Sequence, residues 1–228
     1  MKRGKFVVIE GIDGTGKETQ AKLLVEKLKK KGFRVKMMDF PQYEKTFFGR
    51  LVGRFLKGEF GNLKEVNPYL AALTFAGDRW QAKEDIENFL NKGAYVVSNR
   101  YALSNMHQVS KLPVRRRQKI LDFLEELEYG VYKIPREDLD IVLDLPAKIG
   151  RKLVMKKRSR SYLGSKKKKD IQEANVAYQE ETRKVYNLLV KKFPYIKKVS
   201  CIRGGDLMRV EEVHEKVWNV VSDSLGIK

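Results

Sequence analysis

The sequence predicts an α/β protein in which a parallel β-sheet lies between two layers of helices. Short apolar runs rich in β-branched residues alternate with longer segments whose apolar residues recur at helical spacing. A glycine-rich loop joins the first apolar run to the first helical segment. The 228 residues contain no internal repeat and no low-complexity linker, so we expect a single domain over residues 1–228.

The N-terminal half predicts three strands with helices between them. The first strand is expected at 5–10 and is followed by a helix with apolar residues at 3.6-residue spacing. A second strand at 34–40 precedes a helix near 47–56. Asn67-Pro68 predicts the start of a longer helix, because Asn is a favoured N-cap and Pro is favoured at the first helical position. Gly93 ends that helix before a third strand at 94–99.

The C-terminal half continues the alternation. Pro113 begins a helix that carries apolar residues to Leu127, and strands are expected at 140–145 and 196–202. Asp170 with Glu173 resembles a capping box and predicts another helix start. The last helix spans about 209–225, and its stripe of valines indicates core packing.

Residues 11–19, Gly-Ile-Asp-Gly-Thr-Gly-Lys-Glu-Thr, nearly match the phosphate-binding pattern G-x-x-x-x-G-K-[ST]. Glycines let such a loop turn tightly and direct backbone N–H groups at phosphate oxygens, while the lysine reaches the β and γ phosphates. We expect Lys17 to have no protein partner before a phosphate binds. The sequence therefore predicts nucleoside triphosphate binding and a P-loop NTPase-type three-layer α/β/α fold with a five-stranded parallel sheet; a plain glycine-rich turn is the alternative. The expected triphosphate-binding residues are Gly11, Ile12, Asp13, Gly14, Thr15, Gly16, Lys17, Glu18 and Thr19.

Glu18 departs from this pattern, since Ser or Thr normally ligates Mg²⁺ at its position. Its carboxylate is a candidate metal ligand. The alternative is an acidic residue in the first helical turn, where the helix dipole favours negative charge.

The formal net charge of +19 is concentrated in one segment. Residues 151–170 hold ten Lys or Arg residues and one acid, which gives +9. We expect a basic lid at about 156–170 that closes over phosphates. The Lys166–Lys169 run is expected to be a solvated face.

The chain has no apolar run long enough to cross a membrane and no secretory signal at the N-terminus, so we expect a soluble cytoplasmic protein. Cys201 is the single cysteine and is expected in the core, which excludes a disulfide framework. Two histidines, His107 and His214, are too few and too far apart to predict a zinc site.

Five motifs, which occur in the same order as in the thymidylate kinase family, give this chain a resemblance to that family over nearly its full length. They are Val8-Ile-Glu-Gly-Ile-Asp-Gly-Thr-Gly-Lys17, Asp39-Phe-Pro41, Phe75-Ala-Gly-Asp-Arg-Trp80, Asn99-Arg-Tyr101 with Ser104-Asn105, and Asp140-Ile-Val-Leu-Asp-Leu145. The resemblance implies transfer of the γ-phosphoryl group of ATP to dTMP with Mg²⁺, giving dTDP and ADP in dTTP biosynthesis. It also implies a homodimer, for which the apolar helices near 67–92 and 113–129 are candidate interfaces.

The resemblance assigns roles to individual residues. Asp13 is expected to bind the sugar 3′-OH, Phe75 to stack on thymine, and Arg79 to donate to a base carbonyl; as a bare pattern, Phe75 also fits a core residue. The remaining substrate-binding residues are expected to be Phe40, Pro41, Arg100, Ser104, Asn105 and Gln108. Gln108 replaces a tyrosine that crowds the sugar 2′ position in many relatives. Either Lys45 or Arg50 is expected to hold the acceptor phosphate.

Lys17, Arg100, Arg158 and Arg160 are the expected catalytic residues. Arg100 is expected to bridge the acceptor and transferring phosphates. Gly14 stands where some relatives have an arginine, so a lid arginine, Arg158 or Arg160, is expected to supply the missing donor.

Asn99 also departs from the family, which usually has Asp before Arg100. We expect Glu18 to compensate, because the first and third strands of such kinases are neighbours and the two positions lie at one edge of the sheet. Two other functions remain open: a kinase for another nucleoside monophosphate, and a divergent non-catalytic protein that binds nucleotides or polyanions. Specific nucleic acid binding is not expected.

Overall fold

The computed structural model describes residues 3–63, 65–156 and 175–227. Their core is the expected five-stranded parallel sheet, and its strand order is β2-β3-β1-β4-β5. The strands are β1 (Phe6–Glu10), β2 (Val35–Asp39), β3 (Tyr95–Asn99), β4 (Leu139–Asp144) and β5 (Ile196–Ser200). Each overlaps its predicted range closely. The first and third strands are neighbours, with Ile9 in register with Asn99.

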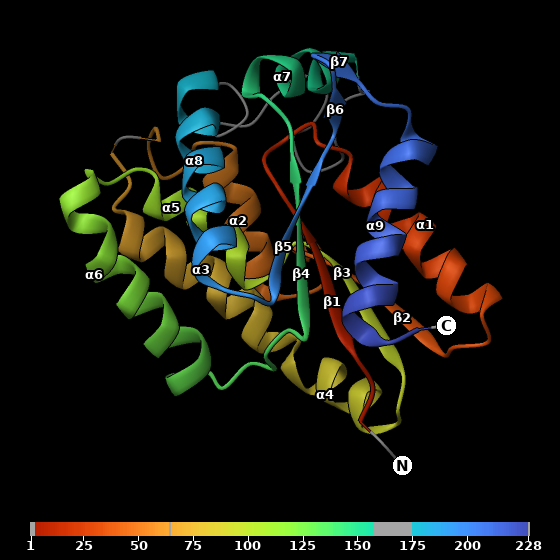
Figure 1. Ribbon diagram of the computed structural model, residues 1–228. Helices are drawn as coiled ribbons and strands as arrows, with labels where there is room; N and C mark the ends of the chain where they lie inside the picture. The colour runs from red at the N-terminus through yellow and green to blue at the C-terminus, as the bar shows by residue number, and fades with distance from the viewer. Residues whose placement is uncertain (1–2, 64, 157–174, 228) are drawn as a thin grey trace.

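Helices cover both faces of the sheet (Figure 1). On one face lie α1 (Lys17–Lys30) and α9 (Val210–Leu225), which pack on Val7 and Ile9 of β1. The other face carries most of the remaining helices, and there Phe6 and Val8 are buried. Successive strand residues point to opposite faces, so the continuous apolar run of β1 is what a doubly covered strand requires.

The second face is built from α2 (Phe47–Leu56), α3 (Pro68–Gln81), α4 (Lys83–Asn91), α5 (Met106–Val109), α6 (Val114–Glu125) and α8 (Val176–Lys192). Asn67 caps α3 through the N–H of Tyr69, as expected. The single helix expected up to Gly93 is wrong, because the chain changes direction at Ala82 (φ −95°, ψ 0°). Glu84 and Asp85 then stabilise the new N-terminus of α4.

Several elements were not expected from the sequence. A 3₁₀ turn, η1 (Ala102–Asn105), precedes α5, and a π-helical turn, η2 (Glu126–Val131), extends α6. A small hairpin of β6 (Ile202–Arg203) and β7 (Asp206–Leu207) follows β5.

Most of the expected lid falls between α7 (Ala147–Lys156) and α8, outside the described residues. The capping box expected at Asp170 and Glu173 also lies outside them. In the described chain α8 begins at Val176 with Asn175 as its N-cap. Within the described ranges, none of the helices has the length and apolar character needed to cross a membrane. Cys201 is buried, as expected.

Candidate active site

The glycine-rich loop lies between β1 and α1 at the carboxyl edge of the sheet. Gly14 has a positive φ of 85°, which L side chains rarely adopt. A Cβ there would also lie 2.2 Å from the backbone oxygen of Gly150 on α7. The loop therefore requires glycine at this position both for its turn and for its close contact with α7.

Lys17 is the first residue of α1, directly after the loop, and is buried. Its Nζ donates to the carbonyl of Ile12 at 2.8 Å and lies 4.0 Å from Oδ1 of Asp13. The expectation that Lys17 is unpaired without a phosphate is wrong, because the loop folds around the ammonium group and its own carbonyl accepts from it. A buried charge without such partners would be costly.

Arg100 and Asp13 meet across the neighbouring strands β1 and β3. Nη2 of Arg100 donates to Oδ1 of Asp13 at 2.5 Å, and Nη1 donates to Ser104 Oγ at 3.3 Å. Arg100 has a φ of 68°, a strained conformation for a residue with a side chain. Burial lowers the pKa of Arg100, but the combined effect of Asp13 and other nearby acidic groups, Glu10 among them, raises it overall. Arg100 thus hydrogen-bonds two other expected site residues, Asp13 and Ser104.

Two residues that sequence reasoning missed hold this arrangement. Gln179 on α8 donates to Oδ2 of Asp13 at 2.8 Å and accepts from the Asp13 N–H at 3.1 Å. Glu10 is fully buried and accepts from the N–H of Tyr101 at 2.7 Å and from Ser104 Oγ at 3.0 Å. The sequence offered one signal for Glu10, which is an acidic residue at the end of an otherwise apolar strand.

A pocket opens beside this contact. Its lining contains the expected Asp13, Phe40, Pro41, Phe75, Arg79, Arg100 and Ser104, together with the unexpected Tyr43, Leu56, Asp78 and His107. The peptide bond between Phe40 and Pro41 is cis. Phe75 lies edge-on to Phe55, with ring centroids 6.0 Å apart, so it has both a core contact and a face in the pocket.

Arg79 is buried in a two-pronged ion pair with Glu128 of η2. Its Nε donates to Oε2 at 2.7 Å and its Nη2 to Oε1 at 2.5 Å. Asn105 donates to the same Oε1 at 2.7 Å. Glu128 therefore orients two of the expected base-binding residues, although Asn105 and Gln108 do not line the pocket themselves. No pattern in the sequence linked Glu128 to this site.

Asp78 fixes the loop that carries Phe40 and Pro41. Its carboxylate accepts from the Gln42 N–H at 2.8 Å and from the Thr46 hydroxyl. Burial raises the pKa of Asp78, and these hydrogen bonds counteract that rise. Lys45 and Arg50, the candidates for the acceptor phosphate, are exposed and do not line the pocket.

Glu18 forms an i,i+4 ion pair with Lys22 at 2.5 Å. Asn99 donates to Oδ1 of Asp39 at 2.6 Å, so a carboxylate stands beside the position where the family usually has Asp. Partial removal from water raises the pKa of Asp39, and the negative charge of Glu18 adds to this rise. The two carboxylates therefore interact at the same edge of the sheet. Arg158 and Arg160 lie outside the described residues.

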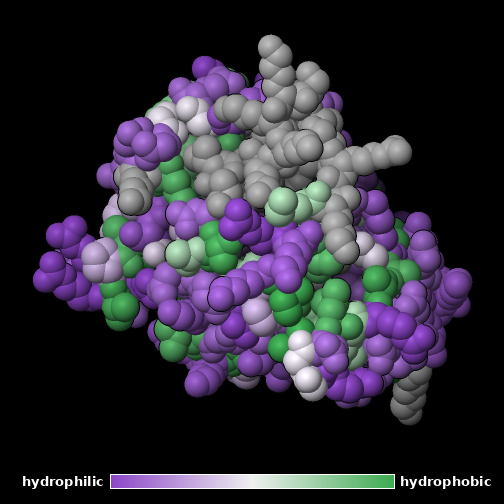
Figure 2. Space-filling model, turned by 90° about the horizontal axis from the view of Figure 1, so that it is seen from above, coloured by the Kyte–Doolittle hydropathy of each residue, from purple (hydrophilic) through white to green (hydrophobic). Residues whose placement is uncertain are grey.

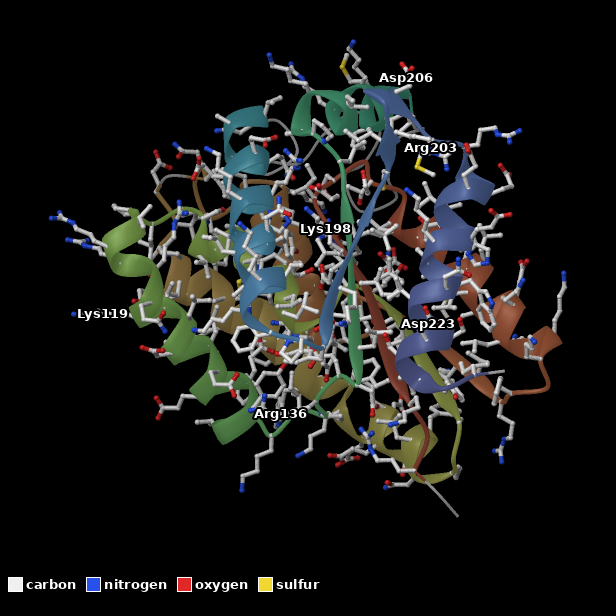
Figure 3. All side chains as sticks on the ribbon, viewed as in Figure 1. Lys119, Arg136, Lys198, Arg203, Asp206 and Asp223 are labelled. Atoms are coloured by element: carbon white, nitrogen blue, oxygen red, sulfur yellow. The ribbon has the colours of Figure 1, made fainter. Side chains whose placement is uncertain are left out.

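Positive charges in the described part of the chain are spread over several surfaces. Figure 3 shows Lys119 pointing outward from α6, whereas Arg203 lies on the β6–β7 hairpin and pairs with Glu212 at 3.0 Å. Figure 2 views the molecule from the end where α7 lies, and hydrophilic side chains there surround apolar patches.

The glycine-rich loop with its lysine lies at the edge of a sheet in the order 2-3-1-4-5, and Arg100 connects it to the adjacent pocket. This combination defines a P-loop phosphotransferase. The family model described as thymidylate kinase matches residues 9–203, and the chain belongs to the thymidylate kinase family.

Known relatives agree with this membership. A probable thymidylate kinase of Pyrococcus abyssi is 33% identical over 226 residues, covering 98% of each chain. The thymidylate kinase of Plasmodium falciparum is 42% identical over 105 residues, which are 46% of this chain and 48% of that protein. The structure of thymidylate kinase from Candida albicans superposes with a TM-score of 0.71 at 22% identity, covering 97% of this chain and 92% of the other, and supports the fold.

Proposed function

We propose that this protein transfers the γ-phosphoryl group of ATP to dTMP, giving dTDP and ADP. The observation that carries the proposal is the contact between Arg100 and Asp13. It joins the loop that would bind the triphosphate to the pocket that would bind the monophosphate. Two phosphate groups bound on either side of this contact would be brought together, and positioning of this kind supplies much of the catalysis of phosphoryl transfer.

The pocket offers groups for each part of dTMP. Phe75 presents a ring for the base, and Arg79, oriented by Glu128, has further N–H groups for a base carbonyl. Asp13 and Ser104 line the same pocket and are proposed to contact the sugar. Asn105 and Gln108 act from behind the lining, Asn105 through its bond to Glu128.

The chemistry requires neutralisation of charge more than a strong base. Lys17 would stabilise the β and γ phosphates of ATP, and Arg100 would bridge the donor and acceptor phosphates. Arg158 and Arg160, in the basic lid, are proposed to add donors to the transferring group. Guanidinium groups match phosphate oxygens in pairs.

Mg²⁺ is proposed as the metal that accompanies ATP. Mg²⁺ in such sites is held mainly by substrate phosphates and water, with one or two protein carboxylates. Glu18 and Asp39, whose charges interact, meet this requirement. When bound, Mg²⁺ would neutralise charge on the phosphates.

A homodimer is also proposed. Leu70 and Trp80 on α3 and Phe47 on α2 are large apolar side chains that are 62%, 47% and 57% exposed. The two helices pack tightly, because Gly77 of α3 lies directly against the Phe48 ring of α2. Their outer surface is the apolar face on which we expect a second copy to pack. A cytoplasmic location remains our expectation.

The test is a coupled ADP-release assay with ATP, Mg²⁺ and a panel of nucleoside monophosphates. We expect dTMP to be the best acceptor, with dUMP weaker by about 1 to 3 kcal/mol for the missing methyl contact. A preference for AMP, GMP or CMP would instead assign the protein to another class of nucleoside monophosphate kinase.

A further inference from the structure

His107 lines the acceptor pocket but had no role in the expectations drawn from the sequence. It lies on α5, seven residues after Arg100, and only 3% of its surface is exposed. Neither Nδ1 nor Nε2 has a hydrogen-bond partner among the described residues. Each buried polar atom left without a partner costs about 1 to 3 kcal/mol, so this arrangement requires a reason.

The position of the ring is fixed by its surroundings. Tyr178 and Tyr186 of α8 pack against it, with ring centroids 5.7 and 6.4 Å away. The hydroxyl of Tyr178 also donates to the His107 carbonyl at 2.6 Å. The imidazole is thus held rigidly in the pocket wall, as a group that recognises a ligand must be.

The charge state of the ring limits what it can bind. Burial and the nearby cations Arg100 and Lys17 lower the pKa of His107 to about 3, although Asp13 opposes them. A neutral imidazole has one nitrogen that donates and one that accepts. It is therefore a poor partner for phosphate, and its donor and acceptor together match a hydroxyl group.

We infer that His107 is a specificity residue that hydrogen-bonds the sugar hydroxyl of the acceptor nucleotide, beside Asp13. This inference rests on the proposed function, in which the acceptor is dTMP. The hydroxyl of deoxyribose is the 3′-OH. Both carboxylate oxygens of Asp13 already accept hydrogen bonds, one from Arg100 and one from Gln179. A second residue that hydrogen-bonds the 3′-OH would therefore fix the orientation of that hydroxyl.

The test compares dTMP with its 3′-deoxy analogue in wild type, His107→Phe and His107→Ala. His107→Phe keeps a ring between the two tyrosines and removes both nitrogens. We expect either change to lower kcat/KM for dTMP by about 3- to 10-fold, the value of one neutral hydrogen bond, and to leave kcat/KM for the 3′-deoxy analogue unchanged. His214→Phe, on the distant helix α9, is the matched control and should alter neither.

An equal loss with both nucleotides, or no loss with either, would overturn the inference, since a packing role does not distinguish them. A loss confined to the ribose analogue of dTMP would overturn it too, because the partner would then be the 2′-OH. Absence of dTMP turnover in the wild type would contradict the proposed function instead. Calorimetric binding of the two nucleotides to wild type and His107→Phe would then test His107 independently.

Discussion

Lys17 illustrates how a single side chain is held ready for a ligand. Its bonds to the loop keep the ammonium group in place without a phosphate, but they are available for exchange when phosphate arrives. We predict that Lys17→Ala lowers kcat by about 10²- to 10³-fold, the usual cost of removing one donor that stabilises transition-state charge. Steady-state kinetics with ATP and dTMP provide the measurement, and circular dichroism should show an unchanged fold.

The exposed Lys29, in the last turn of the same helix, is the matched control, and Lys29→Ala should retain full activity. Full activity in Lys17→Ala would reject the assignment of the loop.

Glu18 and Asn99 depart from the family pattern at one edge of the sheet. If Glu18 replaces the carboxylate that Asn99 lacks, Glu18→Ala should raise the Mg²⁺ requirement and lower kcat. Adding Asn99→Asp should then recover part of the loss, with a coupling of about 0.5 to 3 kcal/mol. A double-mutant cycle on kcat at several Mg²⁺ concentrations measures this coupling. Strict additivity would leave Glu18 as an acid that stabilises the N-terminus of α1.

At the scale of elements, the stretch from η2 to β4 buries acidic groups as well as apolar ones. Glu137 accepts from the Tyr129 hydroxyl at 2.8 Å, but its Oε1 is buried without a partner among the described residues. Burial raises the pKa of Glu137 to about 7. Asp140 on β4 is buried beside it, and burial raises its pKa as well.

This packing predicts a pH-dependent stability. The folded state keeps the Glu137 proton up to about pH 7, whereas the unfolded state loses it near 4.5, so the free energy of unfolding should fall as pH rises through this window. Glu137→Gln, which stays neutral and can still accept from Tyr129, should reduce the fall and add about 3 kcal/mol at pH 8. Urea unfolding at pH 5 and pH 8 measures both effects.

Glu44→Gln, at an exposed position before α2, serves as the control and should leave the pH dependence unchanged. Identical pH profiles for Glu137→Gln and wild type would show that Glu137 ionises normally in the folded protein.

For the whole molecule, the apolar surface of α2 and α3 predicts self-association. Leu70→Asp places a charge on that surface, and light scattering after size exclusion should detect monomers in place of dimers. Leu188 on α8 is similarly exposed, at 59%, and Leu188→Asp should leave the mass unchanged. A monomeric wild type would refute the proposed interface.

Much of the architecture followed from local chemistry. Apolar runs located all five strands, and Asn67 with Pro68 located the start of α3, because buried strands and helix caps have requirements that a few adjacent residues meet. The bend at Ala82 escaped prediction, since no proline or glycine marks it. Its signal was the acidic pair Glu84 and Asp85, which is weak alone.

Residues close together in the chain were enough to predict the phosphate-binding loop, the parallel sheet and the family motifs. The side chains that complete the site could be identified only from the folded chain. Glu128 reaches Arg79 across 49 residues, and Gln179 reaches Asp13 across 166. The physical reason is that a buried charge needs a partner, and folding supplies it from whichever element packs alongside.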